Sequence, residues 1–245
     1  MAKFAVILPA AGKSSRFQDA HYKKVFAPLD NRAVWLHSAE RFLNREDVAQ
    51  VIMVISPQDR EEFMSKFGAN VAILGITVVD GGEERSDSVR NALARVKPDV
   101  EFVAIHDAAR PCIANEWIDA VFAAAEKHSA AILAIPVSGT LKRVGDGHSI
   151  DATVSRTGLW EAQTPQVFRR QLLMDAYAKL SGPVTDDSQV VEQFGHSVKV
   201  VPGSPINLKI TTKEDMRLAS QALKALPKPK LLGPTHPFAD DDMWR

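Results

Sequence analysis

Short apolar runs that alternate with longer amphipathic segments are the feature of this sequence that most constrains its fold. The runs at residues 4–8, 51–55, 102–106, 131–135 and 206–210 have the length of β-strands, and a further edge strand is expected at 73–79. Several are apolar throughout, as in strands covered on both faces. The sequence therefore predicts an α/β fold with a mostly parallel sheet flanked by helices.

Capping residues predict where three of the helices begin. Ser56 followed by Pro57 predicts a helix that runs to about residue 67. Asn115 is expected to cap the next helix, in which apolar residues recur at helical spacing. Thr212 with Asp215 resembles a capping box. Helices between successive strands indicate βαβ crossovers, which are right-handed by default.

Composition excludes several classes of protein. The 245 residues include 30 Lys+Arg and 30 Asp+Glu, so the formal net charge is zero, which argues against a nucleic-acid-binding surface as the main function. The single cysteine, Cys112, excludes an intrachain disulfide and a thiolate metal site. The apolar run at 4–8 is too short for a signal peptide or a membrane span. We expect a cytoplasmic protein with one domain at residues 1–226.

Residues 138–156 differ from this pattern and predict a projecting β-arm. Asp146-Gly147 is a hairpin-turn signal, and its flanks have few large apolar residues. An isolated two-stranded hairpin is marginally stable in water, so this arm is expected to rest on a partner subunit. A mobile surface hairpin is the alternative. Residues 227–245, with four prolines and an acidic run, are expected to form a peripheral tail.

The segment after the first predicted strand is a candidate anion-binding loop. Pro9, Ala10, Ala11 and Gly12 are small enough for backbone N–H groups to approach an anion, and Arg16 adds a fixed charge. It is not a P-loop, because that motif requires a glycine at the position of Ile7. The dinucleotide fingerprint also fails, because Ser14 and Phe17 replace two of its glycines. A plain tight turn is the alternative.

Two further segments carry features that suit a phosphate ligand. Lys23 and Lys24 follow the first loop, so one ammonium group could neutralise a polyphosphate, although both could equally be solvated surface. Gly81 and Gly82 precede an amphipathic run, which is expected to place free backbone amides and the Ser88 hydroxyl near a helix start. An ordinary capped loop is the alternative there.

Asp107 follows the predicted strand at 102–106, where ligands of open α/β sheets bind. A single carboxylate beside phosphates suits Mg²⁺, and Arg110 suits a second phosphate. An Asp–Arg pair that stabilises the loop is the alternative. Two later cations complete the candidate set: Arg156 ends the arm, and Lys209 alternates with apolar residues in the last predicted strand.

In their order along the chain, these motifs resemble the 2-C-methyl-D-erythritol 4-phosphate cytidylyltransferase family over about residues 3–225. The motifs are Pro9-Ala10-Ala11-Gly12 with Arg16, Asp80-Gly81-Gly82 with Glu84-Arg85 and Asp87-Ser88, His106-Asp107-Ala108-Ala109-Arg110-Pro111, Thr140-Leu141-Lys142-Arg143, Arg156 with Gly158-Leu159-Trp160, Thr164-Pro165-Gln166, Thr185-Asp186 and Asn207-Leu208-Lys209.

The resemblance implies a Rossmann-like nucleotidyltransferase fold and a homodimer in which the arm reaches the neighbouring active site. It also implies an activity: CMP passes from CTP to 2-C-methyl-D-erythritol 4-phosphate, with Mg²⁺, and pyrophosphate is released, in isoprenoid precursor biosynthesis. A ribitol 5-phosphate cytidylyltransferase is the alternative of the same class. A non-catalytic nucleotide-binding regulatory protein is the alternative of another class.

The resemblance also assigns roles to residues. Arg16 and Lys24 would stabilise the CTP phosphates, with Lys23 as the second choice of lysine. Arg156 and Lys209 would hold the acceptor phosphate, assisted by Arg110, Thr140 and Thr185. Asp107 would lie near the metal. The positions that match CTP contacts are Pro9, Ala10, Ala11, Gly12, Ser14, Gly81, Gly82, Ser88, Asp107 and Ala108. This chain departs from the family pattern at Ser14, at Lys23-Lys24-Val25, where the family has Pro-Lys-Gln, and at Ile206.

Overall fold

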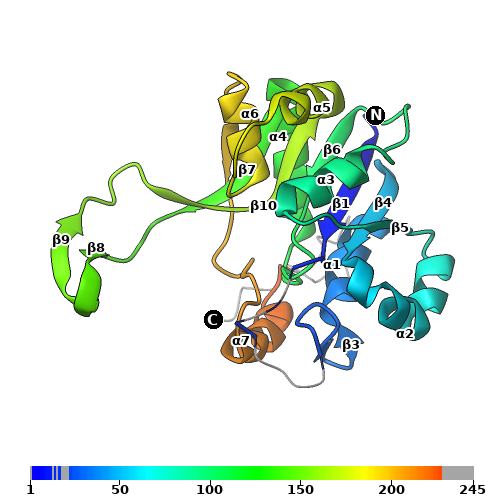
Figure 1. Ribbon diagram of the computed structural model, residues 1–245, viewed down its shortest axis with the longest axis horizontal. Helices are drawn as coiled ribbons and strands as arrows, with labels where there is room; N and C mark the ends of the chain where they lie inside the picture. Colours follow the sequence, from blue (N-terminus) through cyan, green and yellow to red (C-terminus); the bar gives the residue numbers. More distant parts are fainter. Residues whose placement is uncertain (1, 13, 15, 18–21, 228–245) are drawn as a thin grey trace, which may run out of the picture.

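The computed structural model describes residues 2–12, 14, 16, 17 and 22–227 and contains a central seven-stranded sheet (Figure 1). The strand order is β11-β7-β10-β6-β1-β4-β5. The bounds are β1 Phe4–Pro9, β4 Val48–Ile55, β5 Thr77–Asp80, β6 Phe102–Ile105, β7 Ala130–Pro136, β10 Trp160–Arg169 and β11 Lys199–Pro202. Only β10 runs antiparallel to its neighbours, so the prediction of a mostly parallel sheet is confirmed.

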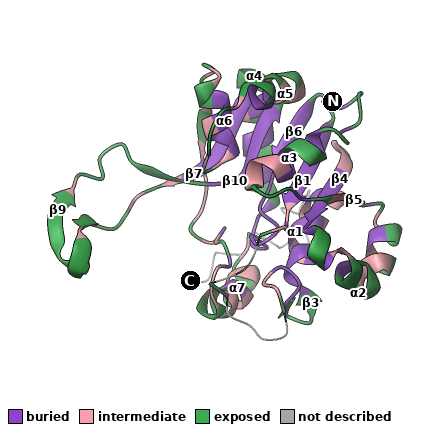
Figure 2. Cartoon of the chain, viewed as in Figure 1, coloured by how far each residue is buried: buried purple, intermediate pink, exposed green. Residues whose placement is uncertain are grey.

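Helices cover both faces of this sheet. The helices are α1 Val34–Leu43, α2 Arg60–Ile73, α3 Arg85–Leu93, α4 Asn115–His128, α5 Arg170–Lys179, α6 Asp187–Gln193 and α7 Lys213–Lys224. One core cluster joins the sheet to α1, α2 and α4, and the other joins it to α3, α5 and α6. In β1, Val6 belongs to the first cluster and Ile7 to the second, which explains why the strand is apolar at every position (Figure 2).

Four of the predicted strands form close to their expected bounds, whereas the strand predicted at 206–210 is wrong. That segment pairs with no strand among the described residues. Its apolar residues Ile206, Leu208 and Ile210 pack in a third cluster with α7, so their alternation records burial against a helix. The edge strand expected at 73–79 is β5, and Ile73 instead ends α2.

Two of the three predicted helix starts are confirmed, and the third differs at its cap. The helix expected at Pro57 begins as a short 3₁₀ turn, η1 Pro57–Asp59, and continues through α2. Asn115 is the first residue of α4 and does not cap it, because Ala114 holds the cap position. The capping box of Thr212 and Asp215 is confirmed at the start of α7.

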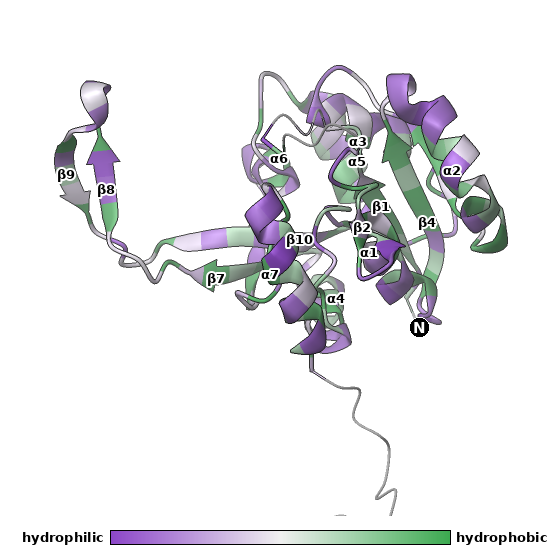
Figure 3. Ribbon diagram, turned by 90° about the horizontal axis from the view of Figure 1, so that it is seen from below, coloured by the Kyte–Doolittle hydropathy of each residue, from purple (hydrophilic) through white to green (hydrophobic). Residues whose placement is uncertain are grey.

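The arm is a two-stranded hairpin that projects from the body (Figures 1 and 3). It contains β8 Leu141–Val144 and β9 Ile150–Val154, joined by the turn η2 Asp146–His148. Gly147 has a φ of 77°, which explains the preference for glycine in this turn.

A second small hairpin, β2 Pro28–Leu29 with β3 Arg32–Ala33, precedes α1. No helix within the described residues is long and apolar enough to cross a membrane. Apart from Pro227, the tail prediction for 227–245 lies outside the described residues.

Candidate active site

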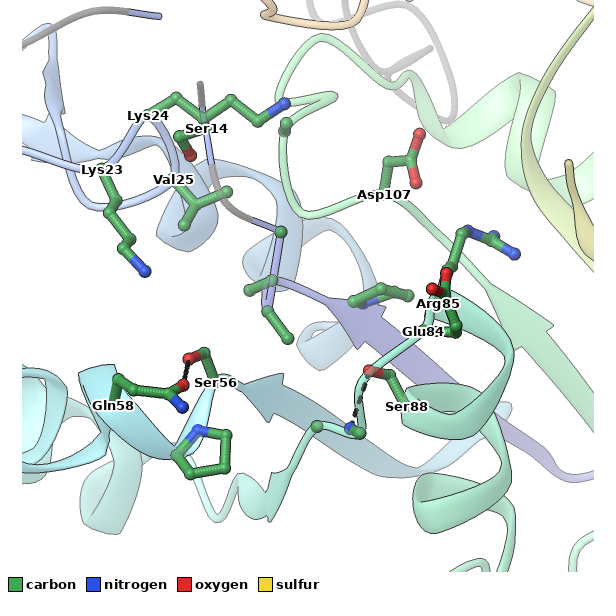
Figure 4. A pocket seen from close by; sticks show the side chains of 18 of the residues that line it. Ser14, Lys23, Lys24, Val25, Ser56, Gln58, Glu84, Arg85, Ser88 and Asp107 are labelled. Atoms are coloured by element: carbon green, nitrogen blue, oxygen red, sulfur yellow. Dashed lines mark hydrogen bonds between the residues drawn. The ribbon is translucent and has the colours of Figure 1, made fainter. Parts of the chain in front are cut away.

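A cavity of about 1060 Å³ lies beyond the carboxyl ends of four neighbouring parallel strands, β6, β1, β4 and β5 (Figure 4). This is where ligands bind in open α/β sheets. The predicted site residues in its wall are Pro9, Ala10, Ala11, Gly12, Ser14, Lys24, Gly81, Gly82, Ser88, Asp107 and Lys209. The fold therefore brings together segments from across the chain.

The loop after β1 keeps the amides that the sequence predicts for an anion. The Ala10 amide donates to the Val54 carbonyl at 2.8 Å. Among the described residues, nothing accepts a hydrogen bond from the amides of Ala11 and Gly12, which lie in the cavity wall. Unpartnered amides beside a cavity are suited to bind phosphate oxygens.

The backbone amides of Gly81 and Gly82, after β5, were predicted to be free, but both form hydrogen bonds within the protein. The Gly81 amide donates to the Ile55 carbonyl at 2.8 Å, and the Gly82 amide donates to Ser88 Oγ at 3.1 Å. A Cβ atom on Gly81 would lie 2.6 Å from the Ala11 Cβ, so only glycine fits there. Both amides are thus used within the protein, and the pair serves to bring bare backbone close to the first loop.

Ser14 combines two unfavourable features at the cavity wall. Its φ is 53°, in the left-handed region that serine rarely occupies. Its hydroxyl oxygen is buried and has no hydrogen-bond partner among the described residues. Arg16 lies just beyond, in a turn closed by a 3.0 Å bond from the Phe17 amide to the Ser14 carbonyl. Arg16 is exposed and outside the cavity wall, but its charge contributes to lowering the pKa of Lys24.

The two loop lysines have different environments. The Lys23 ammonium forms an ion pair with the largely buried Asp59 carboxylate. Lys24 is partly buried, and its pKa is lowered first by burial and then by the charge of Lys209, while Asp107 opposes this shift. Figure 4 shows Lys24 extending towards the side where Asp107 lies, whereas Lys23 points towards Gln58. The loop is held in place by the Trp35 amide, which donates to the Val25 carbonyl at 3.0 Å.

Asp107 is an ionised carboxylate surrounded by cations. Its Oδ2 lies 2.8 Å from the Lys209 Nζ and 3.6 Å from the Arg110 Nε. Burial alone would raise the pKa of Asp107, but Lys209, Arg85 and Arg110 together hold it well below its usual range. The neighbouring His106 is fully buried, and burial lowers its pKa to about 4, so the ring is neutral near pH 7. Asp107 thus places a buried negative charge in this wall.

The contacts of Arg110 fit the alternative interpretation of the sequence, in which an Asp–Arg pair stabilises the loop after β6. Its guanidinium is buried, donates to the Asn207 carbonyl at 2.6 Å and lies beside Asp107. The Asn207 amide group in turn donates to the Thr164 carbonyl at 2.9 Å. These contacts fix the segment that carries Lys209 against β6 and β10. Ala108 is also fully buried, and its carbonyl accepts from the Ser38 hydroxyl at 3.0 Å.

Six predicted site residues do not line this cavity: Arg16, Ala108 and Arg110, described above, and Thr140, Arg156 and Thr185. Thr140 directly precedes β8 and Arg156 lies two residues after β9, and both are exposed. Thr185 uses its amide and hydroxyl to bond Gln189 Oε1, at 2.7 and 3.1 Å, ahead of α6. The single chain therefore does not gather all of the residues predicted for the acceptor phosphate.

Several residues of the cavity wall were not among those predicted from the sequence. Ser56, Pro57 and Gln58 follow β4 directly, but they were interpreted only as a helix start. The rule that placed Asp107 after β6 would have found them at the next strand end. Arg85 was noted in a motif without a role, and its partner Asp187 lies 102 residues away, so no local signal identifies the pair.

Comparison with known proteins supplies the family. The family model "2-C-methyl-D-erythritol 4-phosphate cytidylyltransferase" matches residues 4–225. The protein of that name from Rhodopirellula baltica is 43% identical over 235 residues, covering 91% of this chain and 95% of the relative. The one from Endomicrobium trichonymphae is 40% identical, covering 91% and 100%. A crystal structure of 4-diphosphocytidyl-2C-methyl-D-erythritol synthase superposes with a TM-score of 0.75 at 31% identity, covering 91% of this chain and 99% of that one.

The match spans nearly the whole described chain and 95–100% of these relatives, and several of the motifs on which the resemblance rests line the cavity. The chain therefore belongs to the 2-C-methyl-D-erythritol 4-phosphate cytidylyltransferase family.

Proposed function

We propose that this protein transfers CMP from CTP to 2-C-methyl-D-erythritol 4-phosphate and releases pyrophosphate. One observation carries the proposal: Lys24, Lys209 and the amides of Ala11 and Gly12 converge on a single cavity large enough for a nucleoside triphosphate. An anionic ligand matches this set of donors, and the family of the chain makes CTP that ligand.

The reaction requires two anions to meet. An oxygen of the acceptor phosphate attacks the α-phosphorus of CTP, a new P–O bond forms, and the bond from the α-phosphorus to the bridging oxygen breaks in line. The electron pair leaves with pyrophosphate. The nucleophile is already anionic, so the protein does not have to remove a proton. Its task is to position the reactants and to stabilise the charge that develops, with Arg16 and Lys24 on the triphosphate and Lys209 on the acceptor.

The donor set also fits a divalent cation. The described residues contain no cluster of three or more His, Cys, Asp or Glu side chains that could hold a metal alone. Asp107 is ionised, and Lys209 contacts only one of its oxygens, Oδ2, so Oδ1 can serve as one ligand. Mg²⁺ usually takes one or two carboxylates together with phosphates and water. The ion would neutralise phosphate charge when bound.

The arm supports a proposal of a homodimer. It presents Val144 and Ile150 with 50% and 63% of their surface exposed, along with Thr140 and Arg156, and Leu159 and Trp160 just beyond it are 42% and 45% exposed. Apolar residues on a projecting hairpin favour burial against another subunit. We propose that each arm lies on the partner and brings Thr140 and Arg156 to its cavity. The proposed unit is one nucleotidyltransferase domain at 1–226 in the cytoplasm, a location consistent with its single cysteine.

The activity is tested by incubating the protein with CTP, Mg²⁺ and 2-C-methyl-D-erythritol 4-phosphate and measuring pyrophosphate and a cytidine diphosphate product. Ribitol 5-phosphate in a parallel reaction tests the acceptor. We expect turnover with the methylerythritol phosphate that exceeds turnover with ribitol 5-phosphate. CTP binding without turnover on either acceptor would refute an enzymatic role.

Subunit complementation tests the arm. We expect Arg156→Ala and Lys209→Met each to be nearly inactive as homodimers. When the two are co-expressed, each heterodimer restores one site that has both residues, so a random mixture should regain about a quarter of wild-type activity. Activity of the mixture no higher than that of either variant would contradict an arm that acts in trans.

Ser14 provides a test of the first loop. Ser14→Gly removes both the left-handed strain and the unpaired hydroxyl, so denaturant unfolding without ligand should show a gain of about 1 kcal/mol. The same variant should bind CTP about 2–10-fold more weakly, because a phosphate oxygen loses a donor. Ser14→Ala keeps the strain and serves as the control. Tighter CTP binding by Ser14→Gly would contradict a contact from the hydroxyl.

A further inference from the structure

Arg85 and Asp187 form an ion pair between the start of α3 and the start of α6. Arg85 is the first residue of α3, three positions after Gly82, and it lies in the cavity wall. Asp187 is the first residue of α6, two positions after Thr185. The Arg85 Nη2 donates to the Asp187 Oδ2. No other ion pair of the described residues joins α3 to α6.

Asp187 is held from several sides. Its side chain is fully buried, and its Oδ1 accepts a hydrogen bond from the Tyr177 hydroxyl at 2.5 Å. The Asp187 amide donates to Gln166 Oε1 at 3.1 Å, which ties α6 to the antiparallel strand β10. The carboxylate therefore has little freedom to move, and it fixes the position of any cation that it binds.

Arg85 connects this fixed carboxylate to the cavity. About 30% of its side chain is exposed, and the charge of Asp187 helps to hold the pKa of Arg85 above its usual range. Arg85 is also close enough to Asp107 to contribute to the low pKa of that carboxyl group. Figure 4 shows the guanidinium turned away from the loop lysines. This orientation suits a residue that holds the wall better than one that grips a ligand.

A buried ion pair is weak evidence for stability, because removing two charges from water offsets much of their attraction. Such a pair does fix geometry, because a guanidinium and a carboxylate meet in a defined orientation. Here the two ends of the pair lie on different parts of the site. The α3 end carries Gly82 and Ser88 at the proposed nucleotide side, and the α6 end carries Thr185 at the proposed acceptor side.

We propose that Arg85 and Asp187 are positioning residues that fix the nucleotide side of the cavity relative to the acceptor side. This inference rests on the proposed function. A misplacement of about 1 Å between reactants can cost roughly 100-fold in rate. Binding of CTP alone depends on the nucleotide side only, so it is much less sensitive to the pair than transfer to the acceptor is.

The test compares Arg85→Gln, Asp187→Asn, the double variant and Arg85→Lys. We expect each single variant to lower kcat/KM for the acceptor by roughly 30–100-fold and to change the Kd for CTP, measured without acceptor, by less than about threefold. The double variant should be no slower than the worse single variant, because both changes break one pair. Arg85→Lys should recover part of the rate, since it keeps the charge but not the planar fork.

Two controls separate positioning from folding. Tyr177→Phe removes the other hydrogen bond to Asp187, and we expect a lower Tm with kinetics within about twofold of wild type. Arg90→Gln removes an arginine from the same helix outside the cavity wall, and it should change neither Tm nor kinetics by much. Hydrogen exchange adds a readout without turnover: CTP should protect the amides of residues 185–188 in wild type but not in Arg85→Gln.

Three results would overturn the inference. If Arg85→Gln weakens CTP binding as much as it slows transfer while Asp187→Asn does neither, Arg85 is a direct phosphate ligand. If the variants lower Tm and leave kinetics unchanged, the pair is structural only. Additive losses in the double variant would show that the two residues act separately. An inactive wild type would refute the proposed function instead, and the exchange experiment would still report on the pair.

Discussion

Replacing Lys24 by alanine is expected to lower kcat by about 100-fold or more. This is the scale seen when a preorganised group that stabilises charge in the transition state is removed. The reason is its environment. Lys24 is partly buried beside Asp107 and Lys209, where its charge is poorly screened by water. Steady-state kinetics with CTP and acceptor measure the effect.

Lys23→Ala is the matched control, since it removes the same charge one residue earlier. Lys23 is already paired with Asp59, so its loss should change kcat by less than about threefold. The reverse order of the two effects would show that Lys23 is the phosphate-stabilising residue and that its ion pair opens when CTP binds.

The lowered pKa of Lys24 also predicts a pH dependence. The ammonium form is the active one, so kcat/KM for CTP is highest below the pKa of Lys24 and falls as pH rises through it. Because burial and Lys209 lower that pKa from 10.5, the fall should begin at a lower pH than for an ordinary lysine. Lys24→Arg stays charged and should lack this fall. A wild-type profile that is flat up to pH 10.5 would contradict the assignment.

Asp107→Asn is expected to have the second large effect, with kcat lower by roughly 100–1,000-fold. The carboxylate holds Lys209 at 2.8 Å and is the candidate metal ligand at the end of β6. Its loss would free Lys209 and remove that ligand. Assays over a range of Mg²⁺ concentrations measure the change. Full activity at ordinary Mg²⁺ would refute both roles of Asp107.

The same variant should be less stable, by about 2–3 kcal/mol, because a largely buried carboxylate would no longer compensate Arg110 and Lys209. The effect depends on pH. The pKa of Asp107 is depressed in the folded state, so its contribution is fully present above the unfolded value near 3.8 and is lost progressively as pH falls from there through the lower folded-state value. Unfolding curves between pH 2 and 7 should therefore converge for wild type and Asp107→Asn at the acid end. A constant difference across that range would contradict this account.

The sequence alone determined the fold class and most of the cavity. Strands such as β1 are apolar at every position because helices cover both faces, and that pattern is local and readable. Small or charged residues directly after such strands are placed together by the parallel topology itself. For this reason the loop after β1, the glycine pair after β5 and Asp107 after β6 were all predicted to be near one another.

The family resemblance supplied roles that spacing could not. It singled out Lys24 from two adjacent lysines. In the structure Lys23 is paired with Asp59, which comes from a segment 36 residues away. Nothing local in the lysine loop reveals that partner.

The tertiary structure alone decided which partner each polar or apolar group has. Periodicity indicates that Ile206, Leu208 and Ile210 face an apolar surface, but they pack with α7 rather than in a sheet, so the predicted strand was wrong. The amides of Gly81 and Gly82 were expected to be free and are instead bonded to Ile55 and Ser88. Hydrogen bonds and ion pairs are contacts between particular atoms, often from segments about 100 residues apart such as Arg85 and Asp187, and a linear pattern does not encode them.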